Sequence, residues 1–315
     1  MFKTFAQRLG RRGGDDASVA PGEHEALAAP RVRLQPVFIG GTGRSGTHVT
    51  ARLLGAHPAY HRIPTEVRFI SDKGGLCDLA DGRTTVPLFE DRLLGYWFER
   101  SQGGLHRIAD RATVEEVLRK HRAGLRSDPR TAAVAFTHDL LDPMAAAQGA
   151  QGWIDSTPTN VSRARTLLKL FPEMRLVHSI RDGRDVACSI VPLHWGPTDV
   201  DDGLDWWATK VERGFAACDS LPGDRLLVMQ MEELVERDRE REYRRLLAFF
   251  GLQDDPSTHA YFDSDITPEK AHIGRWRHDV PPERQAAFDA HYHRLADELI
   301  QRGRPYVAGG RPASA

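Results

Sequence analysis

Short apolar runs alternate with amphipathic stretches along this chain, and the alternation predicts strands that take turns with helices. An apolar run at 37–39 leads into a glycine-rich turn at 40–47, and apolar residues then recur at helical spacing through Leu54. Runs of the length expected for further strands lie at 59–63, 152–155, 174–180 and 225–231. Such alternation is typical of helices packed on a parallel sheet. We therefore expect a single α/β domain with a mostly parallel central sheet flanked by helices.

The remaining segments are assigned from the same patterns. Helical periodicity predicts helices near 88–101, 112–125, 204–218, 240–250 and 282–301. The short apolar run at 132–136 is a candidate strand, whereas residues 71–86 are rich in Gly and Asp and are expected to form a surface loop. Composition predicts a disordered tail at 1–34, a domain at 35–303 and a flexible tail at 304–315.

The turn at 40–47 has the composition of an anion-binding loop. Glycines let the backbone fold so that successive N–H groups converge, and the start of the following helix adds further N–H groups. Arg44 contributes a charge and Thr47 a hydroxyl donor. The turn departs from a nucleotide triphosphate P-loop because Thr47 stands where that motif needs Lys. A dinucleotide-binding G-x-G-x-x-G pattern does fit 41–46, with Glu66 as its acidic partner.

A second candidate anion site follows the predicted strand at 174–180. Arg181 stands at the carboxyl end of this strand, where open α/β sheets bind their ligands. Gly183 permits a sharp turn into a helical pattern that begins at Asp185. Ser189 lies eight residues after Arg181 and could reach back toward the same space. An arginine on a helix cap and a buried helix serine are the purely structural alternative.

Both motifs resemble those of sulfotransferases that use PAPS (3′-phosphoadenosine-5′-phosphosulfate). R-S-G-T at 44–47 is similar to their P-loop-like loop for the 5′-phosphosulfate, and Arg181 with Ser189 is similar to their element for the 3′-phosphate. Gly-Arg-Trp at 274–276 resembles a late loop that closes over the nucleotide, where Arg meets phosphate and Trp offers a flat face. The resemblance implies two separate cation sets, one for each phosphate. The donor-binding residues that it implies are Gly43, Arg44, Ser45, Gly46, Thr47, His48, Arg181, Ser189, Arg275 and Trp276.

The catalytic residues implied by the resemblance are Arg44 and Glu66. Arg44 would stabilise charge on the leaving oxygen. Tyrosylprotein sulfotransferases are similar to this chain in following the loop with His-Pro, here 57–58, and then with an acidic residue and an arginine, here Glu66 and Arg68. This order makes Glu66 the candidate general base, with a surface ion pair to Arg68 as the alternative.

The placement of Glu66 depends on the sheet. We expect the strand at 59–63 to lie beside the first strand, so that Glu66 returns to the edge that carries the phosphate loop. If Glu66 is not the base, His48 or His194 is the next candidate. Ser156 stands where many bacterial members have the lysine of Lys-Thr-Pro, so another cation would have to fill that gap.

Composition limits the other classes of function. The chain has 43 Lys and Arg against 44 Asp and Glu, and a net charge of −1 argues against a general nucleic-acid binder. The three cysteines, Cys77, Cys188 and Cys218, have no metal spacing and favour a reducing cytoplasm. No apolar run approaches the length of a membrane span, and no metal site is expected.

The resemblance therefore implies sulfuryl transfer from PAPS to an acceptor hydroxyl, with PAP (3′,5′-adenosine bisphosphate) as product. The acceptor stays open among carbohydrate, peptide tyrosine, lipid and small metabolite, and the oligomeric state also stays open. One alternative is a nucleotide kinase or NTPase, against which the missing loop lysine argues. The other is a nucleotide-binding regulatory protein without chemistry, against which Glu66 argues.

Overall fold

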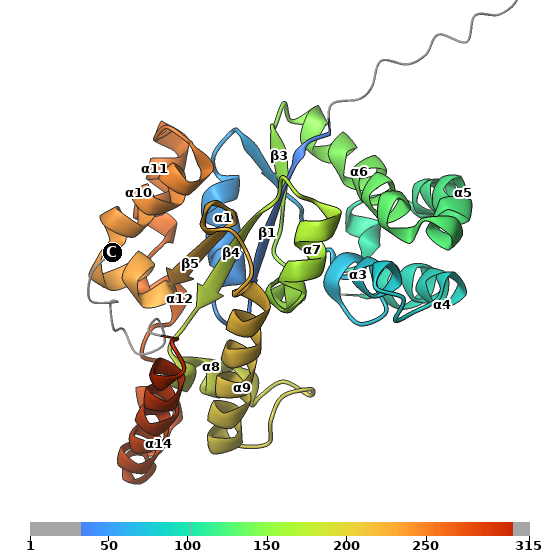
Figure 1. The fold of residues 1–315 in the computed structure, drawn as a ribbon. Coiled ribbons are helices and arrows are strands. Elements are labelled where there is room, and N and C mark those ends of the chain that lie inside the picture. Colours follow the sequence, from blue (N-terminus) through green and yellow to red (C-terminus); the bar gives the residue numbers. More distant parts are fainter. Residues whose placement is uncertain (1–32, 102, 305–315) are drawn as a thin grey trace, which may run out of the picture. The chain divides into compact units, whose positions relative to one another are not determined.

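The structure is a computed structural model that describes residues 33–101 and 103–304. A five-stranded parallel sheet forms the centre of this part of the chain (Figure 1). The strand order is β2-β3-β1-β4-β5, and every neighbouring pair is parallel. The α/β fold with a parallel central sheet is thus confirmed. The predicted tails at 1–34 and 304–315 lie almost entirely outside the described residues. The strands are β1 (Gln35–Gly41), β2 (Tyr60–Arg62), β3 (Gly152–Asp155), β4 (Arg175–Ile180) and β5 (Leu226–Gln230).

The central strand β1 is buried on both faces, as its continuous apolar run requires. Phe38 points into a cluster on one face, where Trp153 and Phe171 lie with ring centroids 5.6 Å away. Val37 and Ile39 point into a second cluster on the opposite face. The two-residue period of the strand therefore divides the core into two layers.

Helices cover both faces of the sheet and one end of it (Figure 1). One face packs on α1 (Thr47–Gly55), α10 (Arg239–Phe250), α11 (Pro256–Asp265) and α12 (Pro268–Ala271). The other face packs on α3 (Leu76–Ala80), α4 (Val86–Asp91), α5 (Arg111–Ser127), α6 (Pro129–Ala147) and α7 (Ala164–Leu170). A third cluster joins α8 (Gly183–Ile190), α9 (Val200–Cys218), α13 (Trp276–Asp279) and α14 (Pro282–Gln301). Shorter elements are α2 (Arg68–Ser71), π-helical turns at Arg92–Trp97 and Glu233–Arg237, and 3-10 turns at Leu105–Arg107, Pro158–Arg163 and Gly223–Arg225.

Two local predictions are wrong. Residues 71–86 are not wholly a surface loop, because they contain the buried helix α3. The apolar run at 132–136 is not a strand and lies inside α6. Asp128 begins α6 by accepting a hydrogen bond from the backbone N–H of Thr131, and the apolar positions then continue at helical spacing beyond the short run.

The predicted neighbour of β1 is also wrong, because β3 lies between β1 and β2. A long helical segment, α2 to α6, separates β2 from β3 in the chain, and the later strand occupies the place beside β1. All strands are nevertheless parallel, so the segments that follow them leave the same edge of the sheet. Arg44, Glu66, Ser156, Arg181 and Glu232 each lie within a few residues after a different strand.

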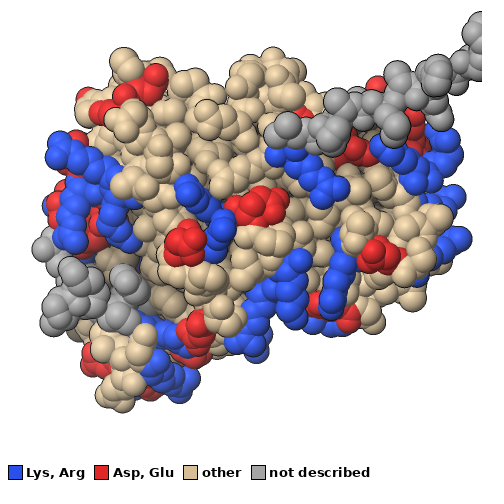
Figure 2. Space-filling view, turned by 45° about the horizontal axis from the view of Figure 1, so that its top comes forward, with Lys and Arg blue, Asp and Glu red and all other residues tan. Residues whose placement is uncertain are grey.

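Charged residues of both signs are interspersed over the face shown in Figure 2. The described part of the chain contains no helix with the length and apolar character needed to cross a membrane.

Candidate active site

The loop between β1 and α1 has the backbone of an anion cradle. Gly43, Arg44 and Gly46 have positive φ angles of 85°, 60° and 87°, and such left-handed residues turn neighbouring N–H groups toward one point. Gly46 stands at the start of α1, where no described side chain caps the helix. The left-handed φ of Gly46 would strain any residue with a Cβ, so the turn favours glycine there. The exposed N–H groups of the first turn are therefore left for a ligand.

Ser45 and Thr47 occupy the buried side of this loop. Ser45 is fully buried, and its Oγ would lie 2.2 Å from a Cβ placed on Gly41, so its side chain packs against β1. Thr47 is 3% exposed at the first position of α1. Oγ of Ser45 is buried and has no hydrogen-bond partner among the described residues.

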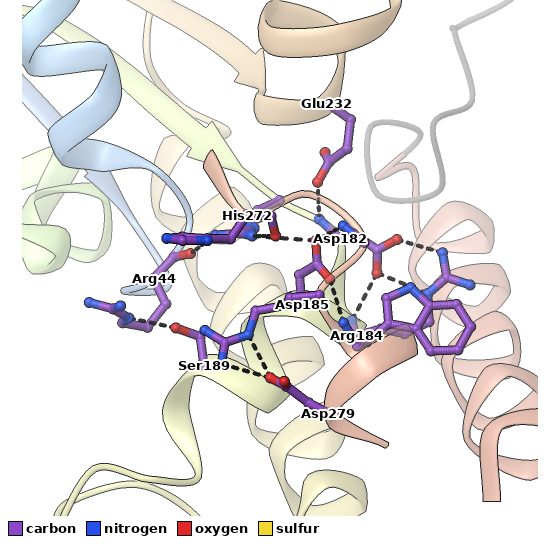
Figure 3. A network of polar contacts seen from close by, with 12 residues as sticks. Arg44, Asp182, Arg184, Asp185, Ser189, Glu232, His272 and Asp279 are labelled. Atoms are coloured by element: carbon purple, nitrogen blue, oxygen red, sulfur yellow. Dashed lines mark hydrogen bonds and ion pairs between the residues drawn. The ribbon is translucent and has the colours of Figure 1, made fainter. Parts of the chain in front are cut away.

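The two predicted anion motifs lie together, because they follow the neighbouring strands β1 and β4. Nε of Arg44 donates to Oγ of Ser189 at 2.8 Å (Figure 3). Nη1 of Arg181 donates to the carbonyl of Arg44 at 3.4 Å. Burial lowers the pKa of Arg44, and the positive charges of Arg181 and Arg275 lower it further. The expected two separate cation sets are thus one cluster in this structure, and its mutual repulsion would be relieved by a multiply charged anion.

Arg181 links three segments around the site. Its Nη2 donates to the carbonyl of His272 at 2.7 Å and lies 3.3 Å from Oδ2 of Asp185. Its Nε is buried and has no hydrogen-bond partner among the described residues. A buried donor without a partner is costly, so this nitrogen fits an anionic ligand.

The backbone of the late loop is held by Asp185. Carboxylate oxygens of Asp185 accept the backbone N–H groups of Gly274 at 2.8 Å and Trp276 at 3.2 Å. Arg275 lies beside the cluster and pairs with Asp279 at 2.7 Å. The loop thereby brings Arg275 to the other two arginines.

The expectation that Trp276 offers an open flat face is wrong for this structure. Its side chain is 7% exposed and packs near Phe288, with ring centroids 6.2 Å apart. The guanidinium groups of Arg184 and Arg277 each lie 4.7 Å from its ring. The apolar ring is used to dock α13 on α14, so Trp276 is a core residue here.

Glu66 lies between a histidine and an arginine. Oε1 of Glu66 is 3.2 Å from Nε2 of His48, and Oε2 forms an ion pair with Nη2 of Arg68. Burial raises the pKa of Glu66, but the hydrogen bond from His48 and the charge of Arg68 outweigh it, so this pKa lies below its usual range. Glu66 also acts on the pKa of Arg44, which places the carboxylate within electrostatic reach of the cation cluster. Both readings of Glu66, ion pair and site residue, are therefore compatible with its position.

Ser156 contacts the opposite side of His48. Oγ of Ser156 is 3.1 Å from Nδ1 of His48. The preceding residue, Asp155, is fully buried and accepts the backbone N–H groups of Val67 at 2.9 Å and Thr157 at 3.0 Å. Asp155 thus ties the segment that carries Glu66 to the segment that carries Ser156. His194 lies on the exposed connection between α8 and α9.

Comparison with known proteins identifies the family. The sequence model of the Sulfotransferase family matches residues 36–256. The chain belongs to the sulfotransferase family. A protein-tyrosine sulfotransferase of Drosophila melanogaster is 23% identical over 224 residues, which cover 69% of this chain and 38% of that protein. The chain thus spans well under half the length of this relative.

Two solved sulfotransferase domains share the fold. One, from the olefin synthase of Synechococcus PCC 7002, is 19% identical with a TM-score of 0.53, covering 86% of this chain and 97% of that domain. The other, from the curacin biosynthetic pathway, is 15% identical with a TM-score of 0.52, covering 85% of this chain and 98% of that domain. The match of the family model over residues 36–256 confirms the family resemblance read from the two motifs.

Several residues of this sulfotransferase-family site carried no role in the sequence analysis. Asp155 and Asp185 organise its loops through backbone N–H groups, and their only sequence signal is an acidic residue close to a strand end. Glu232 accepts the backbone N–H of Asp182 at 2.9 Å from the segment after β5 (Figure 3). Among the described residues, no group of His, Cys, Asp and Glu side chains could hold a metal ion.

Glu232 should make the stability of this sulfotransferase-family chain depend on pH. Burial and the charge of Asp182 raise the pKa of Glu232 to about 7. At pH values between the pKa of this carboxyl group in the unfolded chain and about 7, Glu232 is protonated in the folded protein but ionised in the unfolded chain. The contribution of Glu232 to the free energy of unfolding therefore falls as pH rises through this range. Glu232→Gln keeps an acceptor for Asp182 but cannot ionise. It should raise the free energy of unfolding at pH 8 by up to about 3 kcal/mol.

Urea denaturation of both proteins at pH 5 and pH 8 measures this effect. The gain from Glu232→Gln should appear at pH 8 and vanish at pH 5. Exposed Glu236 is the matched control, and Glu236→Gln should change neither value. An equal change at both pH values would show that ionisation of Glu232 does not destabilise the fold.

Proposed function

We propose that this chain transfers a sulfuryl group from PAPS to an acceptor hydroxyl and releases PAP. The observation that carries the proposal is the meeting of Arg44, Arg181 and Ser189 from two motifs that sequence separates by more than a hundred residues. Three neighbouring arginines, a left-handed glycine loop and an uncapped helix start form a donor set suited to a ligand with several negative charges.

The residues that would hold the donor follow from this geometry. Loop N–H groups from Gly43 to His48, with Thr47, would bind the 5′-phosphosulfate. Arg181, through its unpartnered Nε, and Ser189 would bind the 3′-phosphate. Arg44 and Arg275 would add charge to the same cluster. Trp276 would support the late loop from the core instead of touching the nucleotide.

Bound PAPS supplies a sulfuryl group whose S–O bond to phosphate breaks as the acceptor oxygen bonds to sulfur. Glu66, ionised at neutral pH, takes the proton that the acceptor hydroxyl loses. Arg44 and the first-turn N–H groups of α1 stabilise the negative charge that grows on the departing phosphate oxygen. Because the pKa of Glu66 is low, proton transfer has to accompany bond formation to sulfur rather than precede it.

The wider assignment forms part of the same proposal. A single catalytic domain at 35–303 would act on a hydroxyl-bearing carbohydrate, peptide tyrosine, lipid or small metabolite. The three cysteines are unpaired and buried, which supports a reducing, cytoplasmic location. A kinase or NTPase reading is disfavoured because Thr47 replaces the lysine that binds β- and γ-phosphates in P-loop enzymes.

Incubation with sulfur-labelled PAPS and an extract of the source cell tests this function. We expect label to move to an acceptor, and transfer to continue in EDTA because the site residues themselves supply the positive charge. Label that stays on PAPS with every extract and with simple phenols would contradict the proposal. Transfer that stops in EDTA and returns with magnesium would show that a metal ion, and not the site residues alone, supplies the positive charge.

A further inference from the structure

The imidazole of His48 lies between two side chains from the segments that follow β2 and β3. Its Nδ1 is 3.1 Å from Oγ of Ser156, and its Nε2 is 3.2 Å from Oε1 of Glu66. His48 stands at the second position of α1, directly after the phosphosulfate loop. The three side chains follow β1, β2 and β3, so the parallel sheet assembles them from segments far apart in sequence.

The hydrogen-bonding needs of the buried serine fix the histidine tautomer. Ser156 is 1% exposed, and His48 Nδ1 is the partner found for its hydroxyl in the part of the chain that the structure describes. A buried hydroxyl hydrogen requires an acceptor, so Ser156 donates to Nδ1. The ring hydrogen then resides on Nε2 and points at the carboxylate of Glu66.

The segments that carry these partners are themselves anchored. Asp155, next to Ser156, accepts the backbone N–H of Val67, next to Glu66. Arg68 holds the other carboxylate oxygen of Glu66. His48 is less enclosed than Glu66, because half of its side chain is exposed, against 15% for Glu66. By its hydrogen bond to Nδ1, Ser156 therefore keeps the ring of His48 turned toward Glu66.

We propose that Ser156 and His48 form a hydrogen-bond relay that positions the carboxylate of Glu66 for proton transfer. The inference rests on the proposed function, since Glu66 needs an acceptor hydroxyl to deprotonate. His48 is a positioning residue, and Ser156 acts through it by setting its tautomer. Where the family resemblance places a lysine, this chain has the short hydroxyl side chain of Ser156 with the ring of His48 against it. The neighbouring arginines Arg44, Arg181 and Arg275 supply positive charge at the site.

Variants of His48 that retain a polar group at the position of one ring nitrogen distinguish a role in the hydrogen-bond relay from a role in packing. Glutamine places an amide N–H near the position of Nε2, whereas asparagine imitates Nδ1. We expect His48→Ala and His48→Asn to lower kcat about tenfold or more while KM for PAPS stays nearly constant, because misplacing a reacting group is costly. His48→Gln should recover most of the loss. Sulfation of a simple phenol provides the assay.

A double variant tests the order of the relay. Ser156→Ala should lower kcat in the parent protein and have no effect in the His48→Gln background, where no Nδ1 remains to accept its proton. Additive losses would overturn the relay. Equal kcat in the parent and His48→Ala would overturn it as well, with the proposed function intact.

Nitrogen NMR of the His48 ring gives a readout that needs no turnover. At a pH where the ring is neutral, the hydrogen should reside on Nε2 in the parent, and Ser156→Ala should restore a mixture of tautomers. A ring protonated on Nδ1 in the parent would overturn the relay even if no acceptor is found. If the parent protein neither binds PAP nor transfers a sulfuryl group, the proposed function is rejected, and this outcome is distinct from failure of the relay.

Discussion

Replacement of Glu66 by glutamine should lower turnover by roughly 10²-fold or more, the usual scale of general base catalysis, and leave PAP affinity nearly unchanged. Glutamine preserves the size of the side chain and an acceptor for the N–H of His48, but it cannot take up the acceptor's proton. Glu66 contacts His48 and Arg68, not the arginine cluster, so the donor site should stay intact. Initial rates of labelled transfer and PAP titrations measure the two quantities.

Asp72 offers a matched control for the ion-pair reading of Glu66. Arg68 pairs with Asp72 at 3.1 Å as well as with Glu66. Asp72→Asn removes a carboxylate from the same arginine without touching the proposed base, so its turnover should stay near the parent rate. If both variants lose activity equally, the ion pairs of Arg68 matter and Glu66 is not the base. If Glu66→Gln turns over normally, His48 or His194 becomes the candidate.

Local patterns were sufficient to predict the elements that carry the site. The strand, turn and helix around Arg44 and those around Arg181 depend on residues adjacent in sequence, where glycine and apolar spacing determine the backbone. The order of the strands depends on contacts across the sheet, and sequence spacing does not determine it. For this reason the place of β2 was mispredicted, although parallel strands still bring Glu66 to the correct edge.

Side-chain roles that depend on distant packing escaped sequence reasoning. The sequence suggests that Trp276 stacks on a nucleotide, yet its ring docks against Phe288 of α14, more than ten residues further along the chain. Ser156 was visible only as a missing lysine, since its partner His48 is 108 residues away. Asp155 and Asp185 bind backbone N–H groups, and such contacts leave no pattern in the partner's sequence.

Replacement of Arg44 by alanine should weaken PAP binding about 10- to 100-fold, the scale of losing a hydrogen bond between charged groups. Arg44 is a better probe than Arg181, because Arg181 also holds the carbonyls of Arg44 and His272 and its loss would loosen the loops. Arg119, three-quarters exposed on α5, is the control, and Arg119→Ala should bind PAP like the parent. Calorimetric titration with PAP provides both affinities.

The thermal stabilisation of the parent protein by PAP, compared with that by ATP at equal concentration, tests the claim of a PAPS donor site most directly. A ligand that binds the folded state alone raises the melting temperature, and at equal concentration the ligand that binds more tightly raises it more. PAP places phosphates at both the 3′ and 5′ positions, which matches the cation cluster after β1 and β4, whereas ATP has no 3′-phosphate. We expect a clear rise with PAP, a far smaller rise with ATP, and a reduced rise with PAP in Arg44→Ala. Equal stabilisation by the two nucleotides, or none by either, would contradict it.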